Sequence, residues 1–139
     1  MELLRENHHL LKVARSIMFA SNVPKVFWCD AILTATYLNN RMPKRILNYE
    51  TPLKTFLKLF PQTRLFTTLS LKVFGCISFV QYHLPNRTKL DPKSLKCIFL
   101  GYSSTQKGYK CFSREKQRYF VSMDVTFFEN CPLYAKNSL

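Results

Sequence analysis

The sequence predicts an α+β fold, in which N-terminal helices precede a small, strongly bent β-barrel. Residues 3–59 carry apolar side chains at helical spacing, whereas from Lys72 onward short apolar runs alternate with basic, turn-forming segments. Three glycines in 139 residues are few for a chain built largely of sheet, so helix is expected as well as strand. The hydrophobic content of 47% supplies enough apolar surface for a core.

Residues 3–20 predict an amphipathic helix, because their apolar residues recur at helical spacing on one face. The apolar face consists of Leu3, Leu4, Leu10, Leu11, Ala14, Ile17 and Met18. The polar face consists of Glu2, Arg5, Glu6, His9, Lys12, Arg15 and Ser16.

Two further helices follow. Pro24 suits the first turn of a helix that runs to about Arg41, and its apolar residues nearly encircle it, so we expect it to be buried on most sides. Met42 precedes a proline, which ends that helix. Thr51 then predicts the cap of a short helix over 51–59.

The second half predicts strands over 73–81, 97–102, 109–113, 117–122 and 125–128, with turns at 85–87, 91–93 and 114–116. The predicted organisation is a helical part (1–62), a linker (63–72), the barrel (73–129) and a tail (130–139). Alternation along the third and fourth strands predicts Tyr109, Cys111 and Tyr119 on one face of the sheet, and Lys110 and Phe112 on the other.

No catalytic or metal-binding constellation is apparent. The eight acids are scattered, and adjacent His8 and His9 cannot chelate one ion from a helix. Cys76, Cys97 and Cys111 lie in apolar runs and are predicted to pack in the core. A nucleophile made of Cys29 or Cys131 with His83 is conceivable but has no supporting pattern, so solvated histidines are favoured.

The net charge of +13 favours a polyanionic partner, of which nucleic acid is the commonest. Residues 63–139 carry twelve basic and four acidic residues, against nine and four in residues 1–62. Basic and aromatic residues interleave over 107–120, a pattern typical of small barrels that bind single strands. The alternative is that the aromatic residues fill the barrel and the lysines keep it soluble. The candidate nucleic-acid contacts are Arg87, Lys89, Lys93, Lys96, Lys107, Lys110, Arg114, Lys116 and Arg118.

Several motifs resemble copia-type retrotransposon Pol polyproteins. The resemblance rests on 7–18, 22–25, Phe27-Trp28, 37–43, Thr51-Pro52 and 73–129, in this order and spacing. It implies that the helices are a remnant of a ribonuclease-H-like integrase core, and that the barrel is the retroviral polymerase SH3-like domain. In that family, an Asp-Asp-Glu triad binds Mg or Mn; both aspartates precede the matching region, and Leu4 stands where the glutamate belongs.

The resemblance implies a non-catalytic integrase fragment that binds nucleic acid without sequence preference through its basic barrel, DNA in preference to RNA. The parent role is DNA integration. The alternative is a structural or protein-interaction module of the polyprotein. No cofactor, membrane contact or small-molecule substrate is expected. Self-association or contact with other Pol segments is expected. No apolar run is long enough to span a bilayer and no secretory signal is evident, so an intracellular location, nucleus or cytoplasm, is expected.

Overall fold

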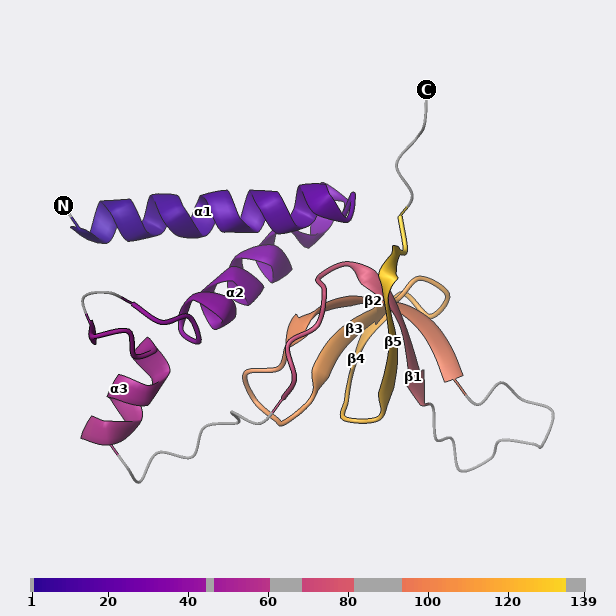
Figure 1. The fold of residues 1–139 in the computed structure, drawn as a ribbon. Helices are drawn as coiled ribbons and strands as arrows, with labels where there is room; N and C mark the ends of the chain where they lie inside the picture. Colours follow the sequence, from indigo (N-terminus) through magenta and orange to yellow (C-terminus); the bar gives the residue numbers. More distant parts are fainter. Residues whose placement is uncertain (1, 45–46, 61–68, 82–93, 135–139) are drawn as a thin grey trace.

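The structure is a computed structural model, and it describes residues 2–44, 47–60, 69–81 and 94–134. The helices are α1 (Glu2–Ala20), the short 3-10 helix η1 (Lys25–Phe27), α2 (Trp28–Asn39) and α3 (Pro52–Leu59). The strands are β1 (Cys76–Gln81), β2 (Ser94–Tyr102), β3 (Tyr109–Ser113), β4 (Arg118–Ser122) and β5 (Val125–Pro132). The predicted α+β order of helices before strands is confirmed (Figure 1).

The amphipathic pattern of α1 is confirmed in its second half. Ala14 and Met18 are buried one turn apart, while Lys12 and Arg15 are exposed. Leu11 was expected on the apolar face, but it is 37% exposed, because the row of buried residues runs beside it on the helix surface. The helix ends where Asn22 adopts a left-handed φ of 52°. There the amide of Val23 donates to the Met18 carbonyl, a Schellman ending.

The second helix begins as η1 and continues as α2. The expectation that it is buried on most sides is confirmed only in part: most residues of α2 are buried or half-buried, but Val26 of η1 is 80% exposed and Leu33 of α2 is 62% exposed. The most deeply buried side carries Ala31, Thr34 and Ala35. One helix face is therefore committed to the core, and the other carries apolar side chains into solvent.

The predicted cap of α3 is confirmed. Thr51 Oγ1 accepts a hydrogen bond from the Lys54 amide at 3.1 Å, and Pro52 is the first residue of the helix.

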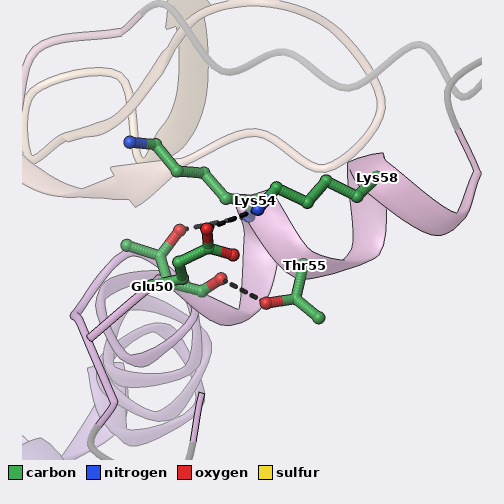
Figure 2. Close-up of polar contacts among 5 residues, drawn as sticks. Glu50, Lys54, Thr55 and Lys58 are labelled. Carbon is green, nitrogen blue, oxygen red and sulfur yellow. Dashed lines mark hydrogen bonds and ion pairs between the residues drawn. The ribbon is translucent and has the colours of Figure 1, made fainter. Parts of the chain in front are cut away.

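Figure 2 shows two further contacts: Thr55 Oγ1 donates to the Thr51 carbonyl, and Lys58 forms an ion pair with Glu50. The amide of Leu53 also donates to the Asn40 carbonyl, which ties α3 to the end of α2.

The described strands form an antiparallel sheet in the order β4-β3-β2-β1-β5. All five predicted strands are present, and the turn expected at 114–116 joins β3 to β4. The turns expected at 85–87 and 91–93 lie outside the described residues. One sheet face holds a core of its own, consisting of Leu69, Cys76, Val80, Leu95, Cys97, Phe99, Tyr109 and Cys111.

The other sheet face shares a core with the helices. Ile98 and Leu100 of β2 are less than 2% exposed, and they join Ala14, Phe27 and Ala31 in one apolar cluster. Phe27 also meets Phe112 of β3, with ring centroids 5.2 Å apart. The helices and the sheet therefore bury apolar surface against each other in the described part of the chain. The limits of the predicted domains stay a prediction.

Two glycines allow this close approach. A Cβ at Gly101 would lie 2.4 Å from Thr34 Oγ1, and a Cβ at Gly75 would lie 2.6 Å from Val23 Cγ2. Gly101 has a φ of 127° and sits at an irregularity in the β2–β3 pairing. Because it has no side chain, the Thr34 hydroxyl reaches the Leu100 carbonyl and donates to it at 3.2 Å. Gly101 thus lies where helix α2 touches the sheet, and Gly75 lies where the connection between α1 and η1 approaches the start of β1.

A buried carboxylate adds a polar link between α2 and the sheet. Asp30 is 5% exposed; its Oδ1 accepts from Lys110 Nζ at 2.7 Å, and its Oδ2 accepts from the Tyr119 hydroxyl at 2.6 Å. The pKa of Tyr119 is raised, mainly because the phenol is partly buried. The hydrogen bond to Asp30 and the negative charge of Asp30 raise it further. The phenol therefore stays protonated and continues to donate. Two charges and a phenol satisfy each other inside the helix–sheet contact.

The predicted facing of the strands is confirmed except at Tyr119. Tyr109 and Cys111 lie in the core of one sheet face, and Lys110 and Phe112 point to the helix side. Tyr119 was expected beside Tyr109 and Cys111. It instead pairs with Phe112 across β3 and β4, ring centroids 5.1 Å apart, and it lies on the helix side. The turn pairs Ser113 with Arg118, and this register determines the face of every β4 side chain.

The predicted burial of three cysteines is confirmed. Cys76, Cys97 and Cys111 are at most 1% exposed, and Cys29 and Cys131 are exposed. Burial raises the pKa of Cys76 to about 12, of Cys97 to about 11 and of Cys111 to about 12. The three buried thiols are consequently poor nucleophiles, because the thiolate is the reactive form.

Gly101→Ala is expected to lower the free energy of unfolding by about 2 kcal/mol or more, since the methyl meets Thr34 and an alanine is strained at this φ. Urea denaturation measures the change. The control is the same substitution in a Thr34→Ala background, where the close contact is gone and the cost should be smaller. An equal cost in both backgrounds would contradict the contact.

Asp30→Ala is expected to destabilise the fold by about 2 kcal/mol, because it leaves the Lys110 ammonium and the Tyr119 hydroxyl without their shared acceptor. Glu115→Ala is the matched control, since it removes an acid that is exposed in a turn and should change stability by less than about 0.5 kcal/mol. Equal losses in the two variants would mean that the link contributes nothing.

Thiol labelling of the native chain at neutral pH is expected to modify Cys29 and Cys131, and to modify the other three only after unfolding. Mass spectrometry counts the labels. Stability should also fall as the pH rises from about 9 towards about 11, because the unfolded thiols lose their protons first while the folded ones keep theirs. Labelling of Cys97 or Cys111 in the native chain would contradict this packing.

Candidate nucleic-acid interface

The structure divides the nine predicted nucleic-acid contacts into groups. Arg87, Lys89 and Lys93 lie outside the described residues. The remaining six lie at two ends of strand β3: Lys96, Arg114, Lys116 and Arg118 at one end, and Lys107 and Lys110 at the other. The two ends are about 14 Å apart, since the five residues of β3 are separated by four steps of about 3.4 Å each.

The first group is built by the β3–β4 turn. Its tight shape comes from Gln117, which has a left-handed φ of 53°, and from the Lys116 amide, which donates to Ser113 Oγ at 3.0 Å. The turn leaves three cations exposed within five residues, and Glu115 is the acid among them. The cationic side chains of this turn are Arg114, Lys116 and Arg118.

Lys96 extends this group from the neighbouring strand. Cys97 pairs with Ser113, so Lys96 stands one position further along β2, beside the start of the turn. Its side chain is exposed. We refer to Lys96, Arg114, Lys116 and Arg118 as the basic hairpin surface.

Aromatic rings support the two arginines of this surface. The Arg118 guanidinium carbon lies 4.5 Å from the centroid of Phe120, and that of Arg114 lies 5.1 Å from the centroid of Tyr134. Such contacts orient a guanidinium while its N–H donors stay available for other acceptors. No ion pair between described residues engages any of the four cations. The basic hairpin surface is therefore a group of positive charges at one end of the sheet, with Arg114 beside the ring of Tyr134 on the helix side and Arg118 beside Phe120 on the other side.

The second group is different. Lys107 is exposed in the loop between β2 and β3, whereas the Lys110 ammonium is held by Asp30 and lies 4.6 Å from the Tyr119 ring centroid. Most of the charge of Lys110 is thus used inside the protein. Sequence reasoning did not identify Asp30, although an acid within an otherwise apolar helical run is a signal for a buried partner.

The remaining candidates for chemistry stay apart. His83, considered with Cys29 or Cys131, lies outside the described residues, and His8 and His9 are exposed. Among the described residues, no group of three His, Cys, Asp or Glu side chains is placed to hold a metal ion. In the same residues, no helix has both the length and the apolar content to cross a membrane.

Comparisons with known proteins identify the family. Residues 76–138 match the family described as the retroviral polymerase SH3-like domain. The chain is 37% identical over 127 residues to each of two Arabidopsis thaliana proteins, the retrovirus-related Pol polyproteins from transposons RE1 and RE2. It is 36% identical over 126 residues to the retrovirus-related Pol polyprotein from transposon TNT 1-94 of Nicotiana tabacum.

These matches cover 91% of the chain but only 8% of the two Arabidopsis polyproteins and 9% of the tobacco one. No solved structure matches the chain. The aligned part includes the helices as well as the sheet, so the resemblance expected from the motifs is confirmed over nearly the whole sequence. The chain belongs to the copia-type retrotransposon Pol polyproteins, as a segment that contains their retroviral polymerase SH3-like domain.

Proposed function

We propose that this segment binds nucleic acid without sequence preference through the basic hairpin surface. The single observation that carries the proposal is the exposure of four cations at one end of the sheet, none of them in an ion pair with another described residue. Such a group displaces counterions from a phosphate backbone, and this release supplies affinity without base recognition.

The arrangement favours contact with the phosphate backbone over base reading. The four cations lie in the β3–β4 turn or near the adjoining ends of β2 and β4, and not along the length of a helix or ribbon that could lie in a groove. Two guanidinium groups rest on aromatic rings, which leaves their N–H forks free to approach phosphate oxygens in pairs. DNA is the expected partner, inside the cell in the nucleus or the cytoplasm, and the role in the polyprotein would be to hold DNA during integration.

The proposal includes no catalysis by this segment. Catalysis is left out because Leu4 stands at the position of the glutamate in the integrase triad. An alkyl side chain cannot bind Mg or Mn. The metal chemistry of the parent protein would then depend on carboxylates that this sequence does not contribute at that position.

A second candidate is a structural or protein-interaction module. It is favoured by apolar side chains on the outer side of the helices, where Phe19 is 78% exposed and Val26 is 80% exposed. Exposed apolar groups of this size are typical of surfaces that meet other proteins. The two candidates use different parts of the molecule, so substitutions distinguish them.

The variant Arg114→Gln/Lys116→Gln/Arg118→Gln is expected to weaken binding to a mixed-sequence oligonucleotide by at least about tenfold at low salt. It should also reduce the slope of log affinity against log salt by about 2 to 3, because up to three phosphate contacts are lost. Fluorescence anisotropy at several salt concentrations measures both quantities.

The matched control is Lys12→Gln/Lys25→Gln/Lys54→Gln, which removes the same charge from exposed lysines on the helical part. It should retain most of the affinity. An equal loss in both variants would show that only total charge matters. No binding by the unmodified chain at low salt would exclude the proposal and leave the interaction module.

A further inference from the structure

A cleft lies between the C-terminal part of α2 and the sheet, at the opposite end of β3 from the basic hairpin surface. Its volume is about 420 Å³, within the range of small-ligand sites. One wall is formed by the side chains of α2 and of the residues just after it, and the other by Leu100 and residues 102–105. Lys110 and Val121 complete the lining.

Arg41 enters this cleft from the end of α2 in a defined orientation. Its guanidinium carbon lies 3.3 Å from the centroid of the Tyr37 ring, and that ring stacks on Tyr102 with centroids 4.0 Å apart. Stacking occupies the flat face of the guanidinium, so its donors remain in the plane. Nη1 donates to the Tyr37 carbonyl at 3.1 Å, and the buried Nε has no acceptor in the described part of the chain.

The charge of Arg41 has no carboxylate partner among the described residues. Burial lowers the pKa of Arg41, which reflects the cost of removing the guanidinium from water. Asp30 is the acid that lines the cleft, and both of its oxygens already accept hydrogen bonds from Lys110 and Tyr119. The lining therefore contains two cations and one anion, and the excess positive charge lies at Arg41.

The opposite wall offers hydroxyl groups. Ser103, Ser104 and Thr105 all line the cleft. Ser103 Oγ accepts from the amides of Thr105 and Gln106, each at 3.3 Å, which folds the loop into a compact turn. The Ser103 and Thr105 hydroxyls lie 3.3 Å apart and share one hydrogen bond, so one of their two protons is used within the loop. An oriented guanidinium and the remaining hydroxyl donors in one cleft suit an anion with several acceptor oxygens, such as a phosphate ester.

We propose that this cleft binds the phosphate group of a nucleotide, with Arg41 as its principal ligand and the 103–105 loop as a source of hydroxyl donors. The nucleotide is either free or part of a strand, and both carry the same phosphate chemistry. The outer face of the guanidinium provides a plane on which a base can stack. The proposal is independent of the basic hairpin surface, because no residue of that surface lines the cleft.

Isothermal titration calorimetry of the full chain with adenosine 5′-monophosphate, adenosine and inorganic phosphate tests the proposal. The monophosphate is expected to bind at least about tenfold more tightly than adenosine, which corresponds to one charge-assisted contact. Arg41→Gln should remove this difference, and Arg41→Lys should retain part of it because the charge remains. A 5′-phosphorylated dinucleotide that binds more tightly than the monophosphate identifies a strand as the source, and equal binding identifies a free nucleotide.

The control is Arg114→Gln/Lys116→Gln/Arg118→Gln, which should leave binding of the monophosphate unchanged even if it abolishes binding of an oligonucleotide. The two proposals therefore fail separately. Urea denaturation checks that each variant is folded. Equal affinity for adenosine and its monophosphate, unchanged binding by both folded Arg41 variants, or no heat with the monophosphate at millimolar concentration would overturn the proposal.

Discussion

The structure depends on how closely helix α2 approaches strand β2. Thr34 donates to the Leu100 carbonyl across a gap that only glycine at position 101 permits, and this contact aligns the helix along the sheet. From that alignment follow the shared apolar core and the placement of Asp30 opposite Lys110 and Tyr119. A side chain at Gly101 would separate the two layers and expose the apolar residues of both.

The close contact between α2 and the sheet also determines which basic side chains are buried and which stay exposed. Lys110 lies on the helix side of β3, where Asp30 holds its charge inside the fold. The hairpin beyond Ser113 lies past the end of the helix contact, so Arg114, Lys116 and Arg118 stay exposed. The basic residues of β3 and its turn are thus divided into an internal cation that supports the fold and cations that are exposed on the surface. The same helix contact creates the cleft beside Arg41.

Much of the fold could be predicted from the sequence, because it is encoded locally. The helix over residues 3–20, the Thr51 cap and the five strands each depend on spacing or on a single residue. Features that depend on pairing between distant residues could not be predicted. The face of Tyr119 follows from the register of the β3–β4 turn, and the exposure of Val26 and Leu33 follows from the position of the second helix on the sheet. The roles of Asp30 and Arg41 likewise depend on partners far along the chain.

We expect an oligonucleotide to meet the exposed hairpin, and not the apolar core between the helices and the sheet. The most direct measurement is the change in backbone amide NMR shifts of the full chain on titration with a mixed-sequence oligonucleotide. We expect the largest changes at Lys96 and over 114–118, with little change at Ala14 and Ala31 in the core shared by the helices and the sheet. Large changes at Ala14 and Ala31, with an unaffected hairpin, would contradict this expectation, because they would mean that the helices leave the sheet to admit the ligand.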